Sequence, residues 1–295
     1  FILMKVLAIE SSCDDTSFSI VSDEKSIDFL ETINHRRFHK KHGGVIPEMA
    51  ARQHLDIMDH LHKFTRKIDF KKIDAIAATY GPGLIGGLIV GSSFAKGLSL
   101  AEQKKLIPIN HLQAHLLSPR LTSNLSFPYL CLLVSGGNTA LVLVKSPKKF
   151  ITLGSSIDDS AGECFDKVAK ALGLDYPGGP VIEKKALTGE LYKYKLPMPL
   201  TKVKNCDFSF SGLKTAAIEV IKKNKNNKRF IENFCASFQY TMGEVFKNKI
   251  AYAFELMNKE NIKFKDFSIC GGVAANQYIN GSIKDFMKEK NVNYH

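Results

Sequence analysis

The sequence predicts an α/β fold built from two similar lobes. Apolar runs typical of buried strands alternate with segments of helical periodicity along all 295 residues, and this alternation is typical of α/β proteins. VLAIESSCDDTSFSIV and YLCLLVSGGNTALVLV both predict a strand, a small polar turn and a returning strand. DAIAATYGPGLIGG and FSICGGVAAN both predict a strand, a glycine turn and the start of a helix. One unit that occurs twice predicts two lobes that face each other across a cleft.

The first lobe, predicted as residues 4–124 with Met4 as the natural start, opens with strands. Apolar and β-branched runs predict strands at 5–10, 17–21, 74–80 and 106–110. Pro47 suits the first turn of a helix, which is predicted to continue to about Lys67. A second helix is predicted after the turn GPGLIGG, and NHLQAHLLSP predicts a short helix that Pro119 ends.

The second lobe, predicted as residues 125–295, repeats the pattern. Strands are predicted at 129–134, 140–144 and 267–270, and helices at about 160–172, 229–259 and 273–290. Residues 190–215 carry several Lys, Pro and Ser and are predicted to be irregular. The chain reaches His295 at the apparent start of another strand.

The composition limits the class of protein. A formal net charge of +12 favours anionic partners such as nucleic acid. No apolar run reaches the ~18 residues that span a bilayer, and no cleavable signal is evident, so membrane association is not predicted. The six cysteines form no Cys-x-x-Cys and mostly occupy apolar stretches. They are predicted to be reduced, buried thiols of a cytoplasmic protein.

Three glycine turns are candidates for binding a phosphorylated ligand. In LVSGGNT, consecutive backbone N–H groups could form an anion-binding nest, or the glycines could serve an ordinary hairpin. GGVAAN could set a nucleotide against a helix N-terminus, although strand-Gly-Gly-helix is also a common packing device. YPGGP could be a turn alone. Each turn is ambiguous by itself, and the prediction depends on their convergence on one cleft.

Acidic residues accompany these turns. Glu163 and Asp166 are three apart in DDSAGECFDK and would share a helix face, where they could bind a metal or ribose hydroxyls. Alternatively, they enrich a helix N-terminus in negative charge. Asp14 and Asp15 in the first hairpin turn could cap that turn or face the cleft.

Two histidine pairs have helical spacing. His111 and His115 lie on the short helix after a strand, and two imidazoles at i and i+4 bind one metal well. No Glu lies between them as in a zinc protease, and surface histidines could share this spacing. His35 and His39 fall in a cationic stretch and are interpreted as part of a basic patch for RNA. The candidate tRNA contacts there are Arg36, Arg37, Lys40, Lys41 and Arg52.

The ordered motifs resemble one known family. IESSCDDTS, HGGVIPEMAARQH, GPGLIGGLIVG, NHLQAHLLSP, LVSGGNT, IDDSAGECFDKVAKALGLDYPGGP, FSFSGLKT and GGVAAN resemble the bacterial TsaD family of tRNA threonylcarbamoyladenosine transferases over essentially the whole chain from Met4. The resemblance implies a two-lobed fold of the actin, Hsp70 and sugar-kinase type. It implies transfer of threonylcarbamoyl from threonylcarbamoyl-AMP to the exocyclic amine of the adenosine 3′ of the anticodon, in tRNAs that read A-starting codons.

The resemblance also implies site residues and partners. His111 and His115 would bind one divalent metal, iron or zinc, which an Asp in a further C-terminal segment beyond His295 would complete. The implied partners are tRNA, a paralogue of the same fold that pairs with the first lobe, and a small ATPase. The residues implied to contact the adenylate are Leu133, Val134, Ser135, Gly136, Gly137, Asp166, Gly179 and Asn276. No general base is predicted.

Three other functions remain open on the residues alone. An ATP-dependent small-molecule kinase of the same fold would transfer phosphoryl groups without tRNA. A metallopeptidase would need a catalytic Glu that the histidine pair lacks. A non-catalytic scaffold would carry a degenerate nucleotide site, which the intact glycine motifs disfavour.

Overall fold

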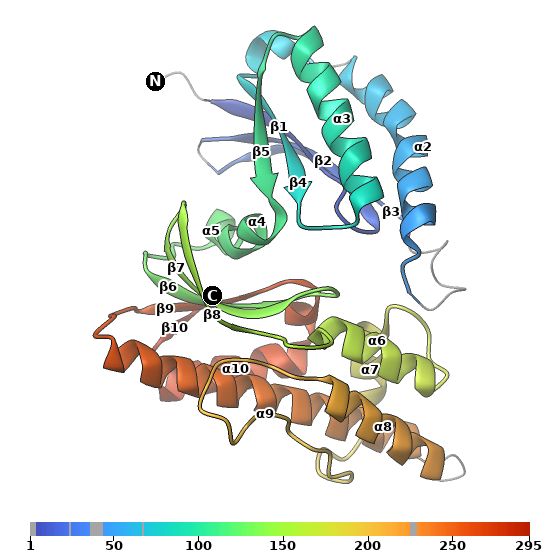
Figure 1. Cartoon of the computed structure of the whole chain (residues 1–295), viewed down its shortest axis with the longest axis vertical. Coiled ribbons are helices and arrows are strands. Elements are labelled where there is room, and N and C mark those ends of the chain that lie inside the picture. Colours follow the sequence, from blue (N-terminus) through green and yellow to red (C-terminus); the bar gives the residue numbers. More distant parts are fainter. Residues whose placement is uncertain (1–3, 24, 36–43, 67, 225–228) are drawn as a thin grey trace. The chain divides into compact units, whose positions relative to one another are not determined.

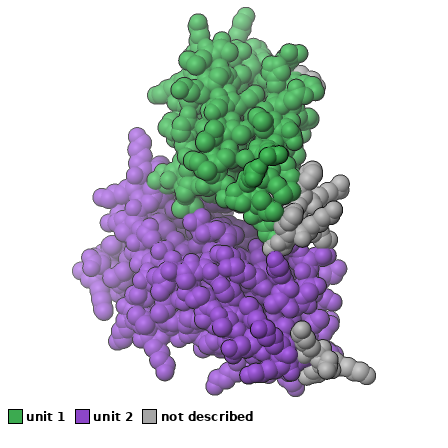
Figure 2. Space-filling model, turned by 45° about the vertical axis from the view of Figure 1, so that its right-hand side comes forward, with its two compact units in different colours: residues 1–114 green, residues 115–295 purple. Residues whose placement is uncertain are grey.

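The computed structural model describes residues 4–23, 25–35, 44–66, 68–224 and 229–295. The chain forms two compact units, Phe1–Ala114 and His115–His295 (Figure 2). The predicted lobe boundary after residue 124 falls inside the second unit and stays a prediction. No helix of the described segments is long and apolar enough to cross a membrane.

The first unit is a five-stranded mixed sheet with the strand order β3-β2-β1-β4-β5 (Figure 1). The strands are β1 (Lys5–Glu10), β2 (Asp15–Ser22), β3 (Ile27–Asn34), β4 (Ala75–Gly81) and β5 (Lys105–Asn110). β1, β2 and β3 pair antiparallel, whereas β1, β4 and β5 pair in parallel. Two helices, α2 (Pro47–Thr65) and α3 (Ile85–Ala101), pack against each other and against the sheet. The parallel pairing brings the carboxyl ends of β1, β4 and β5 to one edge of the sheet.

The second unit has a sheet with the strand order β10-β9-β6-β7-β8. Its strands are β6 (Tyr129–Val134), β7 (Thr139–Ser146), β8 (Lys149–Ser155), β9 (Asp266–Cys270) and β10 (Asn293–Tyr294). β6, β7 and β8 pair antiparallel, whereas β6, β9 and β10 pair in parallel. The two orders become the same when β6 is matched to β1 and β9 to β4. The predicted duplication of one α/β unit is therefore confirmed.

Helices cover the second sheet (Figure 1). They are α6 (Ala161–Ala171), α7 (Gly178–Ala186), α8 (Ser211–Lys223), α9 (Phe230–Lys259) and α10 (Gln277–Glu289). α9 packs against both α7 and α10, while α6 packs against α7 and α8. The long helix α9 buries residues all round its axis, including Phe234, Phe238 and Phe246, because it lies between other helices rather than at the surface. Two short helices, α4 (His111–Leu117) and α5 (Pro119–Thr122), follow β5.

The structure adds elements that the sequence pattern did not indicate. β3 and β8 are edge strands in which many residues are exposed, so neither has the apolar run that marks a buried strand. α8 begins at Ser211 within the stretch predicted to be irregular, and α7 starts inside the predicted YPGGP turn. All six cysteines are free thiols, but Cys13 is exposed, so the prediction that all are buried is wrong at this position.

Candidate functional site

The turn between β6 and β7 presents the first glycine motif. Leu133 and Val134 are buried at the end of β6, and the Ser135 N–H donates to the Asn138 carbonyl at 2.8 Å, which closes the turn. Gly136 and Gly137 are exposed, and a Cβ at either position would meet open space. The turn therefore offers backbone N–H and C=O groups that a ligand could approach closely.

Two glycines from other elements press against this turn. A Cβ at Gly162, in the first turn of α6, would lie 2.5 Å from the Ser135 carbonyl oxygen. A Cβ at Gly271, directly after β9, would lie 2.4 Å from the Val134 carbonyl oxygen. Both approaches are shorter than a side chain allows, so only glycine fits at either position. The start of the GGVAAN motif and the LVSGGNT motif are thus adjacent, as their predicted convergence requires.

The N-terminus of α6 holds the same turn by hydrogen bonds. The Ser160 hydroxyl donates to the Gly136 carbonyl at 2.5 Å and accepts from the Glu163 N–H at 3.2 Å, so it caps the helix while it binds the turn. The Gly162 N–H donates to the Ser135 carbonyl at 3.2 Å. The position of the glycine turn therefore depends on where α6 begins.

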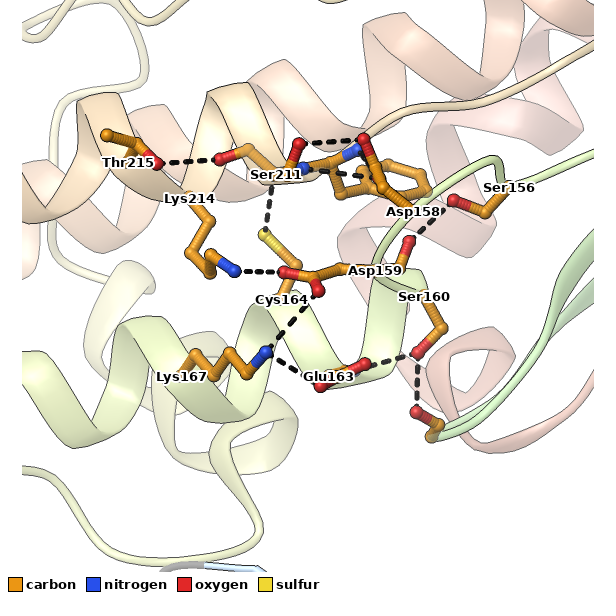
Figure 3. Close-up of polar contacts among 12 residues, drawn as sticks. Ser156, Asp158, Asp159, Ser160, Glu163, Cys164, Lys167, Ser211, Lys214 and Thr215 are labelled. Carbon is orange, nitrogen blue, oxygen red and sulfur yellow. Dashed lines mark hydrogen bonds and ion pairs between the residues drawn. The ribbon is translucent and has the colours of Figure 1, made fainter.

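An acidic residue ahead of α6 caps a second helix (Figure 3). The Asp158 carboxylate accepts from the Phe210 N–H at 2.7 Å, from the Ser211 hydroxyl at 2.7 Å and from the Ser209 hydroxyl at 2.5 Å. Burial raises the pKa of Asp158, but these donors outweigh burial and lower the pKa below its usual value. Since no side chain of α8 itself caps that helix, Asp158 supplies the cap from a distant part of the chain.

The next residue joins α6 to α8 through two lysines (Figure 3). The Asp159 carboxylate pairs with Lys214 of α8 and, at 3.3 Å, with Lys167 of α6. Burial raises the pKa of Asp159, but the two lysines have the larger combined effect, so the pKa is lowered. Asp158 and Asp159 together fix the segment that leads into α6 and hence into the glycine turn.

The lowered pKa of Asp159 predicts an acid-dependent contribution to stability. An unfolded aspartate has a pKa of about 3.9, so the stabilisation is complete above about pH 4 and is lost as pH falls through the lower folded value. We expect Asp159→Asn to lower the unfolding temperature at pH 7, with the difference from wild type shrinking below about pH 4. Thermal unfolding at several pH values measures this. Asp285→Asn, at an exposed position of α10, is the matched control. A difference that stayed constant with pH would contradict the prediction.

The remaining predicted adenylate contacts lie around α6, α7 and α10. Asp166 of α6 accepts the Gly178 N–H at 2.7 Å, at the start of α7, and a Cβ at the neighbouring Gly179 would meet open space. Asn276 is buried and caps α10 by accepting the Ile279 N–H at 2.9 Å. The Glu183 carboxylate of α7 accepts the Gln277 N–H at 2.6 Å and so joins α7 to α10. All three glycine motifs thus belong to one connected part of the second unit.

Glu163 does not form an acidic pair with Asp166 as the helix spacing suggested. Its carboxylate contacts Lys167 at 2.7 Å, whereas Asp166 binds the backbone of α7. Among the described residues, there is no group of three or more His, Cys, Asp or Glu side chains arranged to hold a metal ion.

The histidine pair lies on α4, one helical turn apart. His111 Nδ1 lies 3.2 Å from Glu10 Oε2 and 3.1 Å from Ser12 Oγ. The other Glu10 oxygen accepts the Ser12 N–H at 2.6 Å, and the Thr79 hydroxyl donates to Oε2. Burial raises the pKa of Glu10, but the hydrogen bonds from His111, Ser12 and Thr79 outweigh burial and lower the pKa to about 2.

The imidazole side chains of His111 and His115 are of a chemical type that binds divalent metals. Imidazole nitrogens are good ligands for iron and zinc, and a metal-binding histidine commonly donates its other ring N–H to a carboxylate. His111 has that carboxylate in Glu10. His111 and His115 therefore fit a metal as two of its ligands, and their ligation stays a prediction.

The sequence pattern did not single out Glu10, Ser12 or Thr79. Their positions in the sequence could have indicated the site. Each of the three lies at or just after the carboxyl end of β1 or β4, and His111 directly follows the parallel strand β5. Carboxyl ends of neighbouring parallel strands share one sheet edge. Knowing that β1, β4 and β5 are neighbours would therefore have placed these side chains together.

His35, the described member of the second histidine pair, does not lie at the surface. His35 is buried, and its Nε2 lies 3.1 Å from the Thr16 hydroxyl. The same hydroxyl lies 2.7 Å from Nδ1 of buried His54, whose Nε2 donates to the Cys13 carbonyl at 3.0 Å. The interpretation of His35 as part of an RNA-facing patch is therefore wrong, because the ring is built into the core beside the first hairpin turn.

Most of the candidate tRNA contacts lie outside the residues that the structure describes. Arg36, Arg37, Lys40 and Lys41, like His39, lie outside the described residues. Arg52 is exposed on α2 and pairs with Glu48 at 2.7 Å, so its guanidinium is at the surface, where a phosphate could compete for it.

Fold and site define a class of protein. The duplicated sheet order is that of an α/β fold of the actin, Hsp70 and sugar-kinase type. The fold resembles that of full-length HypF in its phosphate- and nucleotide-bound form, with a TM-score of 0.59 at 13% identity over 99% of this chain and 52% of that one.

Sequence comparison then gives the family. The model of the TsaD family, tRNA N6-adenosine threonylcarbamoyltransferase, matches residues 29–295. The enzyme of that name from Rickettsia rickettsii (strain Sheila Smith) is 48% identical over 94% of this chain and 82% of its own length. The one from Wolbachia pipientis wMel is 44% identical over 95% of this chain and 84% of its own length. The chain belongs to the TsaD family and is a tRNA-modifying transferase.

Proposed function

We propose that the chain transfers a threonylcarbamoyl group from threonylcarbamoyl-AMP to the exocyclic amine of the adenosine 3′ of the anticodon, in tRNAs reading A-starting codons. The observation that carries the donor assignment is the glycine turn at Ser135–Gly137. Its exposed backbone is held from two sides by Gly162 and Gly271. Such a rigid turn suits the phosphate of an adenylate, which is the leaving group of this reaction.

The neighbouring residues supply the rest of the adenylate site in this proposal. Leu133 and Val134 end the strand that carries the turn, and Gly136 and Gly137 let the phosphate approach the backbone. The Asp166 carboxylate accepts the Gly178 N–H where α6 joins α7, Gly179 is the next residue of α7, and Asn276 caps α10. A ribose hydroxyl could bind a carboxylate there, and the start of α10 has the partial positive charge that an anion prefers.

His111 and His115 would hold one divalent metal, iron or zinc. Such an ion, when bound, acts as a Lewis acid that polarises a carbonyl group. The chain's own residues then position the reactants, because an aromatic amine is a weak nucleophile and correct placement supplies much of the rate. The target adenosine lies in a single-stranded loop, where a base can be unstacked at low cost.

The charge and the exposed surface fit the proposed partners. A net charge of +12 suits tRNA, with Arg52 and the basic residues Arg36, Arg37, Lys40 and Lys41 as proposed contacts. In the first unit, Leu55 of α2 is 62% exposed, and Ile85 and Ile89 of α3 are 72% and 56% exposed. A contiguous exposed apolar patch is typical of an interface, and α2 and α3, which carry these three side chains, pack against each other. We assign them to a paralogous subunit of the same fold; a small ATPase is the other proposed partner, and the cytoplasm the proposed location.

Nucleoside mass spectrometry tests this proposal. The protein, with its partner proteins, is incubated with threonylcarbamoyl-AMP and an unmodified tRNA that reads an A-starting codon. We expect threonylcarbamoyl mass on the adenosine beside the anticodon, lost in His111→Ala and retained in His60→Ala, an exposed histidine of α2. Absence of modification with wild type would reject the proposal. Phosphoryl transfer to a small molecule without tRNA would favour the kinase alternative.

A further inference from the structure

We propose that Glu10 is a positioning residue for metal binding: its carboxylate holds His111 in the tautomer that carries the proton on Nδ1. This inference rests on the proposed function, because it requires His111 to be a metal ligand. It adds a residue of β1 to a site whose proposed ligands both lie on α4.

The hydrogen bonds of Glu10 determine which partner donates. Oε1 accepts the Ser12 N–H at 2.6 Å, and Oε2 accepts the Thr79 hydroxyl. The Ser12 N–H can only donate, and the Thr79 hydroxyl donates to Oε2, so both carboxyl oxygens act as acceptors in this geometry. The 3.2 Å contact between Oε2 and His111 Nδ1 therefore requires the proton to be on Nδ1.

The tautomer decides which ring nitrogen can bind a metal. A neutral imidazole has one N–H and one lone pair, so a proton on Nδ1 places the lone pair on Nε2. A metal binds the lone pair, and a carboxylate on the opposite nitrogen raises the basicity of the ring and fixes its orientation. Glu10 thus makes Nε2 of His111 the ligand atom and prepares it before the metal arrives.

The sheet makes this arrangement rigid. Glu10 ends β1 and Thr79 lies on β4, which pairs with β1 in parallel, while His111 follows β5 on the other side of β4. Ser12 is 2% exposed, and its hydroxyl lies 3.1 Å from the same Nδ1. Three neighbouring strands therefore fix the carboxylate and the ring, and neither can turn without breaking bonds to the sheet.

Glu10→Gln is the direct test, since glutamine keeps the shape and removes the charge. The full-length protein is titrated with zinc against a chromogenic chelator, and we expect affinity to fall about 10- to 100-fold. Long-range ¹H–¹⁵N correlation spectra of the metal-free protein, with labelled histidine, should show the Nδ1–H tautomer of His111 in wild type and a mixture in the variant. Glu31→Gln is the matched control, because Glu31 contacts the exposed His60 at 3.2 Å, and it should change neither measurement.

The outcomes separate this inference from the proposed function. If His111→Ala binds zinc as wild type does, the metal role of His111 fails and this inference fails with it. If His111→Ala loses zinc while Glu10→Gln keeps wild-type affinity and tautomer, only the role of Glu10 is wrong. Should Glu10→Gln fail to fold, Glu10→Asp gives the second test. It keeps the charge but shortens the side chain by one methylene and so withdraws the carboxylate from His111 Nδ1, and unchanged affinity with an unchanged tautomer in that variant would overturn the proposal.

Discussion

Gly271→Ala is expected to destabilise the second unit by about 3 kcal/mol, the sum of backbone strain and steric overlap. Gly271 has φ +99° and ψ 171°, a region that only glycine adopts at low cost. The added Cβ would also lie 2.4 Å from the Val134 carbonyl oxygen and 3.2 Å from the Ser135 nitrogen. Both atoms belong to rigid backbone, so the glycine turn itself must move.

The same substitution should impair transfer beyond its effect on stability. A displacement of the order of 1 Å in a positioning element costs about 100-fold in rate, and the Ser135–Gly137 turn is the proposed phosphate site. Chemical denaturation measures the stability, and the tRNA modification assay measures the activity. Gly281→Ala is the matched control on α10, where a Cβ meets nothing within 4 Å and should stabilise the helix by roughly 0.5–1 kcal/mol. Wild-type stability of Gly271→Ala would contradict this account.

The sequence predicts the duplicated fold because three strands in the interior of the two sheets, β4, β6 and β9, are buried at most or all of their positions. YLCLLV is buried at every position of β6, and such a run marks a parallel or central strand without any knowledge of its neighbours. The edge strands β3 and β8 carry no such run, because one side of each pairs with nothing in its own sheet and many of their side chains face solvent. Local pattern therefore predicts the buried strands and misses the edge strands β3 and β8, although it predicts the edge strand β5 from the run LIPIN at 106–110.

The sequence predicted only part of the candidate site, because several of its contacts join residues that are far apart in the chain. Glycine turns and histidines at helical spacing are local patterns, and the sequence indicated both. The contact of Glu10 with His111 joins residues 101 apart in sequence, and the cap that Asp158 gives to α8 joins residues more than 50 apart. Such contacts follow from strand neighbourhood and helix packing. At His35 a local pattern led to a wrong prediction. Its basic neighbours in the sequence suggested an exposed side chain, whereas the ring is buried against Thr16 and His54.

Lys249→Met is expected to destabilise the second unit by about 3 kcal/mol, because it leaves several buried carbonyl groups without a donor. Lys249 lies on α9 and is fully buried. Its Nζ donates to the carbonyls of Leu200, Val203 and Asn205 at 2.8, 3.2 and 3.1 Å, and lies 3.2 Å from Asn205 Oδ1. Burial lowers the pKa of Lys249. The surrounding oxygens replace the hydrogen bonds that the ammonium would otherwise make to water. Methionine matches the unbranched lysine side chain as far as Cε and removes the ammonium group with its three donors.

The segment between α7 and α8 should lose its order in this variant before the rest of the unit unfolds. This segment has little regular structure, so its backbone carbonyls are not paired in a helix or sheet. The Lys249 ammonium supplies hydrogen-bond donors to three of them instead. Lys202 and Lys204 are exposed there, and trypsin should cleave after them faster in Lys249→Met than in wild type, because local opening exposes the backbone to protease. Lys259→Met, at an exposed position of α9, should change neither stability nor cleavage rate. Equal cleavage of Lys249→Met and wild type would mean that the loop is held by its other contacts, such as the Tyr252 hydroxyl bond to the Thr201 carbonyl, and not by the buried ammonium.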